Sequence, residues 1–106
     1  MDQPIAARIE DKLAVLWQRN VPTLLERLDI LDRIAAAAVS GCLTPGDQLE
    51  ARNIAHKLAG TLGMFGYQQG TDVARKLELL LSEPLANPGK LQPLAASLRQ
   101  SIFPAN

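Results

Sequence analysis

The sequence predicts an all-α fold, on three observations. Leu and Ala supply most of the apolar residues, aromatic residues make up 4%, and β-branched residues are few, a composition that favours helices over strands. Apolar residues recur at helical spacing in successive segments. Short connections marked by Pro or Gly separate the segments, which implies antiparallel neighbours. We therefore expect an antiparallel up-down-up-down four-helix bundle over 22–103, with an additional N-terminal accessory helix over 1–20.

Length and charge limit the classes of protein. At 106 residues and 47% hydrophobic content, the chain suits a single domain over 1–106 with one core. Lys plus Arg and Asp plus Glu number 11 each, so the net charge is zero and no nucleic-acid partner is expected. We expect a monomer.

Cysteine usage and hydropathy point to the cytoplasm. Cys42 is the single cysteine, so neither an internal disulfide nor a zinc site is supported. The N-terminus lacks a basic region followed by an apolar run, and no apolar stretch approaches the roughly 18 residues that span a bilayer. We expect a cytoplasmic protein with no membrane partner.

The first two predicted helices meet at a proline. Pro4 suits a helix entrance, and the helix should end near Asn20, because Val21 precedes Pro22 and a residue before proline disfavours helical geometry. The second helix begins at Pro22 and ends at Ser40-Gly41. The apolar stripes of these two helices are Ile5, Ile9, Leu13, Leu16 and Trp17, then Leu24, Leu28, Leu31, Ala35 and Ala38, with Leu25 and Ile34 beside the second.

The next helix has the clearest entrance in the chain. Thr44-Pro45-Gly46-Asp47 combines an N-cap hydroxyl, proline at the first helical position and an acidic residue beside the positive helix end. Gly63 or Gly66 should end it. A further helix should start between residues 67 and 71 and stop at 82 or 83, and the last should run from Asn87-Pro88 to Pro104. Their stripes are Val73, Leu77, Leu80 and Leu81, then Leu91, Leu94, Leu98 and Ile102, with Ala95 beside the last.

The only histidine, His56, lies on the third predicted helix. At about 100° per residue, the apolar positions of this helix are Leu49, Ala51, Ile54, Ala55, Leu58 and Leu62. His56 therefore points away from the core. The same face carries Arg52, Asn53, Ala59, Gly60 and Gly63.

Gly60 and Gly63 on this face need a reason, because glycine inside a helix costs about 1 kcal/mol relative to alanine. A neighbouring helix could pack closely over them. Alternatively, a bare surface lets an incoming group reach the imidazole. Helical periodicity leaves both explanations open.

The stretch Ala55-His56-Lys57-Leu58-Ala59-Gly60-Thr61-Leu62-Gly63-Met64-Phe65-Gly66 resembles the motif of histidine-containing phosphotransfer (HPt) domains, His-x-Leu-x-Gly followed by small residues, a hydrophobic position and a further glycine. The resemblance implies a four-helix bundle in which His56 is an exposed phosphoacceptor. It also implies that Gly60 leaves room for the phosphoryl group and the docking partner.

The sequence departs from this family at one position. Many members have lysine three residues after the histidine, where this chain has Ala59. Lys57 and Arg52 are the candidate cations for the phosphoryl group, with Lys57 preferred, although exposed charges on helices are more often simply solvated. Arg75-Lys76 on the following helix is a weaker candidate for the same docking surface.

The resemblance implies a phosphocarrier in a multistep phosphorelay. Its partners would be response-regulator receiver domains and a sensor or hybrid histidine kinase, with Mg²⁺ supplied by the receiver and no cofactor or metal held by the chain. The sequence has no Gly-rich nucleotide loop, so we expect no ATP-dependent kinase activity of its own. The alternative is a helical adaptor or degenerate phosphotransfer fold that only binds proteins. A metal- or haem-binding bundle is poorly supported, because no second histidine is present.

Overall fold

The computed structural model describes residues 5–85 and 87–104, with side chains described from residue 11 onward. Its elements are α1 (Ile5–Val39), α2 (Pro45–Met64), α3 (Gln68–Leu81), a 3₁₀ turn η1 (Pro88–Lys90) and α4 (Leu91–Ile102). The described residues contain no strand. The predicted all-α class is thus confirmed, whereas the predicted entrance at Pro4 lies outside the described residues.

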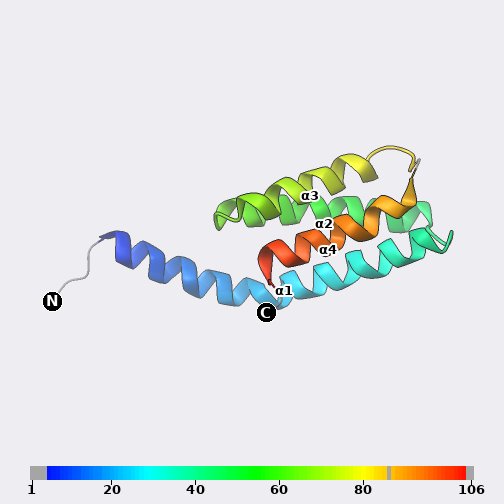
Figure 1. Cartoon of the computed structure of the whole chain (residues 1–106). Coiled ribbons are helices and arrows are strands. Elements are labelled where there is room, and N and C mark those ends of the chain that lie inside the picture. Colours follow the sequence, from blue (N-terminus) through cyan, green and yellow to red (C-terminus); the bar gives the residue numbers. More distant parts are fainter. Residues whose placement is uncertain (1–4, 86, 105–106) are drawn as a thin grey trace.

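The four helices form a closed ring around one core. Each helix runs antiparallel to the one before it (Figure 1). Backbone contacts join α1 to α2, α2 to α3, α3 to α4 and α4 to α1, while the diagonal pairs have none in the described part of the chain. The α2–α3 pair has the most extensive contact. This arrangement confirms the predicted up-down-up-down bundle.

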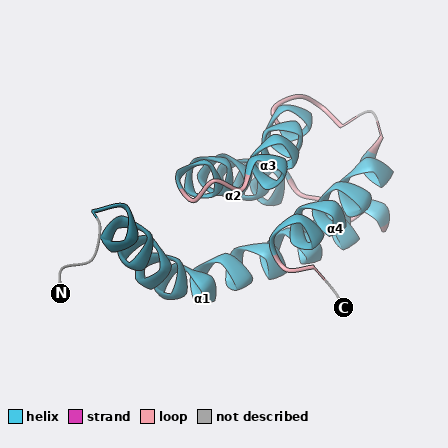
Figure 2. Cartoon of the chain, turned by 60° about the vertical axis from the view of Figure 1, so that its left-hand side comes forward, coloured by secondary structure: helices cyan, strands magenta, loops and turns pink. Residues whose placement is uncertain are grey.

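The N-terminal segment does not form a separate helix. The predicted helix end near Asn20 is wrong, because α1 is continuous over 35 residues with Pro22 inside it. The helix changes direction in its middle part, and its N-terminal half projects beyond the other helices (Figures 1 and 2). Proline removes one backbone donor and kinks a helix without having to end it. No helix in the described residues is both long enough and apolar enough to cross a bilayer.

An aromatic cluster packs α1 against the rest of the bundle just before Pro22. The ring of Trp17 stacks on Tyr67 with centroids 4.6 Å apart. Its centroid also lies 5.2 Å from that of Phe65, in an edge-to-face pair, and 6.3 Å from that of Phe103, in a tilted pair. Such pairs contribute about 0.5–1.5 kcal/mol each beyond their buried area. An interior proline costs about 3 kcal/mol, so these contacts are of the size needed to keep the helix continuous.

Local signals place the other helix ends as predicted. Thr44 Oγ1 accepts a hydrogen bond from the Asp47 amide at 3.0 Å and caps α2. Gly41 and Gly66 adopt positive φ angles of 75° and 81° just after α1 and α2, a conformation that glycine takes without strain. Asn87 caps η1 by accepting from the Gly89 amide. Sequence reasoning was therefore correct about each of these connections.

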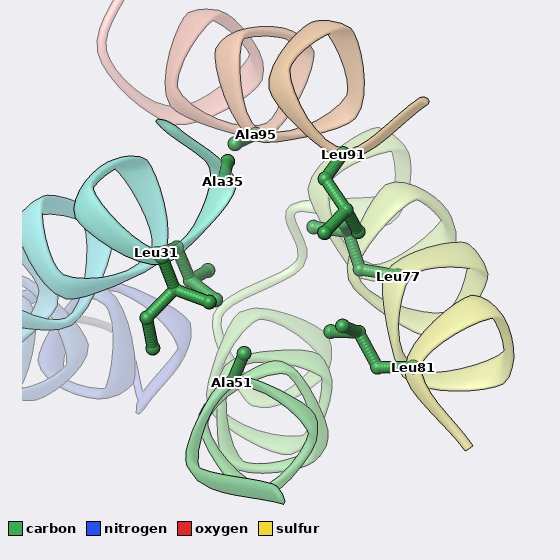
Figure 3. A pocket seen from close by; sticks show the side chains of 8 residues that line it. Leu31, Ala35, Ala51, Leu77, Leu81, Leu91 and Ala95 are labelled. Carbon is green, nitrogen blue, oxygen red and sulfur yellow. The ribbon is translucent and has the colours of Figure 1, made fainter. Parts of the chain in front are cut away.

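The core is built from Leu, Ile, Val and Ala of all four helices. Its largest fully buried side chains are Leu24, Leu28, Ile34, Leu58, Leu62, Leu77 and Leu98. A small internal void of about 10 Å³ lies where the helices converge, lined by Leu31, Ile34, Ala35, Ala51, Leu77, Leu81, Leu91 and Ala95 (Figure 3). All of its lining side chains are apolar, so a water molecule would find no hydrogen-bond partner there. Some predicted apolar positions are wrong: Leu49 is 52% exposed, and Leu13, Leu16 and Leu25 are exposed as well.

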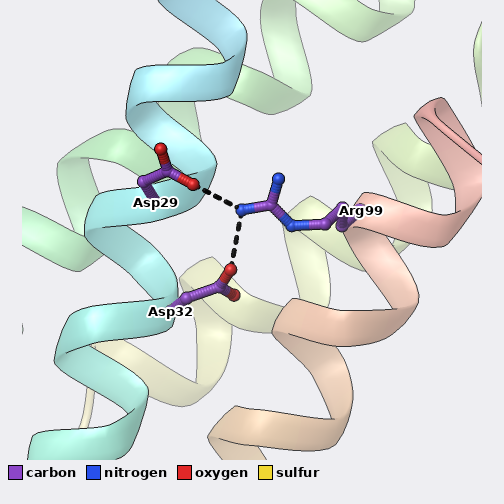
Figure 4. A network of polar contacts seen from close by, with 3 residues as sticks. All are labelled: Asp29, Asp32 and Arg99. Atoms are coloured by element: carbon purple, nitrogen blue, oxygen red, sulfur yellow. Dashed lines mark hydrogen bonds and ion pairs between the residues drawn. The ribbon is translucent and has the colours of Figure 1, made fainter.

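An ion-pair cluster joins the first and last helices of the ring. Arg99 of α4 donates to Asp32 Oδ2 at 2.7 Å and to Asp29 Oδ1 at 2.9 Å, both on α1 (Figure 4). The hydrogen bond to Asp32 is the main cause that raises the pKa of Arg99, opposed in part by burial and supported by Asp29. The guanidinium therefore stays charged, and it bridges two turns of α1.

Candidate functional site

His56 is presented to solvent by a helix whose opposite face is anchored in the core. Its neighbours Ala55 and Leu58 are both 0% exposed, which fixes the rotation of α2. The His56 side chain is 74% exposed. The predicted outward orientation of His56 is thus what the structure has.

One ring nitrogen of His56 is held by a carboxylate of the neighbouring helix. Nδ1 lies 2.8 Å from Oε1 of Glu78 on α3. The Glu78 side chain is 26% exposed. An ionised carboxylate can only accept hydrogen bonds, so Nδ1 must carry the proton. In the neutral ring, Nε2 is then the nitrogen with a free lone pair. The contact therefore fixes both the tautomer and the orientation of the imidazole.

An open groove of about 430 Å³ runs between α2 and α3 beside this pair. Its lining residues are His56, Ala59 and Gly60 from α2, Arg75, Glu78 and Leu79 from α3, and Ser82 just after α3. Leu79 is 72% exposed and forms an apolar rim. The groove thus combines an imidazole, one carboxylate, one guanidinium and an apolar contact surface.

The two glycines of the histidine face have different surroundings. A Cβ added at Gly60 would meet nothing within 4 Å, so this position is bare. A Cβ added at Gly63 would lie 3.7 Å from Oγ1 of Thr71, an ordinary contact with α3. Close helix packing therefore demands glycine at neither position, and the bare-surface explanation fits Gly60. The close approach is found instead at Gly70, on α3.

The weaker candidate Arg75 of α3 lines the groove, whereas the two predicted cations of α2 lie away from it. Lys57 and Arg52 are both exposed, and neither is among the residues that line the groove. Their part in binding a phosphoryl group or a partner stays a prediction. Ala59 was placed on the exposed face by helical phase, but it is 7% exposed and lies at the edge of the core, with one side on the groove.

Sequence reasoning missed Glu78 as a site residue. It lies 22 positions after His56 on another helix, so no local spacing connects the two side chains. The available signal was its place beside the predicted leucine stripe of α3, three residues after Arg75, which puts both polar side chains on one face. Pairing it with His56 requires knowing the register between α2 and α3.

Comparison with known proteins agrees with this geometry. The model of the Hpt domain family matches residues 15–102. Protein RcaC from Microchaete diplosiphon is 38% identical over 89 residues, which cover 84% of this chain and 13% of that protein. The chain thus spans a small part of the length of this curated relative. No solved structure gives a significant match. The chain belongs to the Hpt domain family, the histidine phosphotransfer modules of two-component phosphorelays.

Proposed function

We propose that His56 is the phosphoacceptor, taking a phosphoryl group from a receiver-domain aspartate and passing it to another receiver. The observation that carries the proposal is the exposed imidazole whose Nδ1 is held by Glu78 at 2.8 Å, which leaves Nε2 as the nucleophile. The bare surface at Gly60 supports it, because a receiver must bring its aspartyl phosphate within bonding distance of the ring. Phosphoryl transfer asks for such positioning more than for covalent chemistry by the protein.

The transfer step follows from this arrangement. The Nε2 lone pair attacks phosphorus, the N–P bond forms, and the bond from phosphorus to the aspartyl oxygen breaks, which returns the aspartate as a carboxylate. The positive charge that develops on the ring lies beside Glu78, which accepts the Nδ1 hydrogen bond and can take this proton. In the onward step, the proton returns from Glu78 to Nδ1, a carboxylate oxygen of the second receiver attacks phosphorus, and the N–P bond breaks to release the neutral imidazole.

Hpt domains work with two-component partners such as receiver domains and histidine kinases. For this chain we propose that a sensor or hybrid histidine kinase feeds the donor receiver, in the cytoplasm. Mg²⁺ would enter with the receiver. The carrier would act as a monomer and have no ATP-dependent activity of its own. A receiver would contact the exposed sides of α2 and α3 that border the groove.

The test uses a receiver domain phosphorylated with labelled phosphate as the donor. Wild-type protein should take up acid-labile, alkali-stable label, and His56→Gln should take up none. Lys90→Gln is a matched control, because Lys90 is an exposed residue of η1 outside the groove, and it should label like wild type. Absence of label on wild-type protein with every receiver of the source organism would refute the proposal.

The adaptor alternative is separated by the same experiment. An adaptor would bind a receiver with equal affinity before and after His56→Ala, and neither form would take up label. A phosphocarrier takes up label and loses all of it with this substitution, whatever the effect on binding.

A further inference from the structure

A phosphoryl group in the groove around His56 would need a cation beside it, and the α2 residues of the groove do not provide one. A phosphoryl group on Nε2 adds anionic oxygens to a groove that already holds the Glu78 carboxylate on the other side of the imidazole. Like charges within one groove repel each other, and solvent screens this repulsion only in part. Transfer sites for phosphoryl groups therefore need a cation that faces the oxygens. Along α2 the groove is lined by His56, Ala59 and Gly60, none of which is a permanent cation.

The register between α2 and α3 identifies the residue opposite this gap. His56 meets Glu78, and Gly63, seven residues further along α2, faces Thr71, seven residues back along α3. Both pairs thus obey one antiparallel register. The same register places Arg75, three residues before Glu78, opposite Ala59, three residues after His56.

The surroundings of Arg75 leave it available to a ligand. It is an exposed residue and the one lysine or arginine that lines the groove. None of the ion pairs found among the described residues involves it. Across from it, α2 offers a small side chain at Ala59 and open space at Gly60. A guanidinium can bind phosphoryl oxygens through two parallel hydrogen bonds.

We propose that Arg75 binds the phosphoryl group on His56, so that the cation is supplied from α3 across the groove and not from α2. Ala59 brings no charge to the groove from α2, and Arg75 stands on the facing helix at the same level. The inference rests on the proposed role of His56. It assigns Lys57 and Arg52 no direct contact with the phosphoryl oxygens.

The first experiment compares uptake of label from a phosphorylated receiver by Arg75→Gln, Arg75→Lys and the control Lys90→Gln. Lys90 is an exposed cation of η1 and does not line the groove. Loss of one charge-stabilising group from a transfer site lowers rates by about 100- to 1,000-fold, so Arg75→Gln should fall in this range. Lys90→Gln should stay near wild type, and Arg75→Lys should lie between them.

A second experiment separates phosphoryl binding from receiver docking. Phosphorylated protein is purified away from the receiver, and the half-life of its label is measured. Arg75→Gln should shorten this half-life, a result that a residue used only for docking would not give. Adding Ala59→Lys to Arg75→Gln should restore uptake and half-life, because the new ammonium approaches the same space from α2. Thermal unfolding of each variant shows that the fold is kept.

The outcomes distinguish the two proposals. Wild-type protein that takes up no label overturns the role of His56 and this inference with it. Labelled wild-type protein together with an Arg75→Gln variant of unchanged uptake and half-life overturns the role of Arg75 alone. Reduced uptake with an unchanged half-life would make Arg75 a receiver contact and also refute the inference.

Discussion

Glu78 Oε1 and His56 Nδ1 lie 2.8 Å apart, and they come from α3 and α2, two neighbouring helices of the bundle. This single contact determines which nitrogen of the imidazole is free to react. It also explains why an exposed side chain on a helix surface has a defined orientation.

Glu78→Ala should slow uptake of label by about 10- to 150-fold, since loss of a hydrogen bond to a charged group is worth about 1.5–3 kcal/mol. Glu78→Gln should have a smaller effect, because its amide oxygen can still accept from Nδ1 while the charge is lost. Nitrogen NMR of the ring should show mainly the Nδ1-protonated tautomer in wild type and a mixture in Glu78→Ala. Equal rates for wild type and Glu78→Ala would contradict the positioning role.

Gly60→Ala should leave the fold intact and stabilise it by up to about 1 kcal/mol, because alanine is the better helix former and an added Cβ meets nothing within 4 Å. Gly60→Gln should also fold but block the approach to His56, so uptake from a receiver should drop sharply. Urea unfolding and labelling measured on the same samples test both statements. A Gly60→Gln protein that labels normally would show that the bare surface is not needed.

Gly70→Ala should destabilise the bundle, in contrast to Gly60→Ala. A Cβ at Gly70 would lie 3.0 Å from both Leu62 Cδ1 and Ser101 Oγ. Leu62 is fully buried, and Ser101 is held by a hydrogen bond to the Leu98 carbonyl, so neither atom can move freely. Overpacking of this kind costs about 1–3 kcal/mol, measurable as a lower urea midpoint. An unchanged midpoint would mean that α3 can shift outward without loss of packing.

Pro22→Ala should raise the stability of α1 by up to about 3 kcal/mol, since it restores a backbone donor in an exposed helix interior. Helix content by circular dichroism should rise or stay constant, and the unfolding midpoint should increase. Leu25→Ala, at another exposed α1 position, is a comparison in which no backbone donor is gained. A lower midpoint for Pro22→Ala would show that the kink itself is needed for Trp17 to reach Tyr67.

Sequence patterns predicted the elements of this fold well where local chemistry decides. The Thr44 cap, the positive-φ glycines Gly41 and Gly66 and the Asn87 cap all act within a few residues. The helix end before Pro22 was wrong because aromatic contacts made elsewhere in the chain outweigh a local preference. Leu49 was placed in the core because helical phase predicts a face but not how far a neighbouring helix covers it.

The sequence predicted the α2 side of the site better than the α3 side. The motif and the helical phase give an outward His56 with Gly60 beside it. On α3, Arg75 was named from the sequence only as a weaker candidate for the docking surface, and Glu78 was missed. Their position beside His56 depends on the offset of α2 and α3 along their axes. Periodicity within one helix carries no information about that offset.

The antiparallel α2–α3 pair has a consequence for how this chemistry can be moved or lost. Every residue that lines the groove lies between 56 and 82, and α1 and α4 supply none of them. At the end of this helix pair opposite the 65–67 connection, the Gln48 side chain donates hydrogen bonds to the carbonyls of Leu81 and Glu83. One helical hairpin therefore carries all the residues of the groove, and a different pair of covering helices could pack against it. A one-residue insertion inside α3, between Leu77 and Glu78, would turn Glu78 by about 100° relative to the buried residues before it. The carboxylate would then no longer reach His56, although the histidine itself is unchanged.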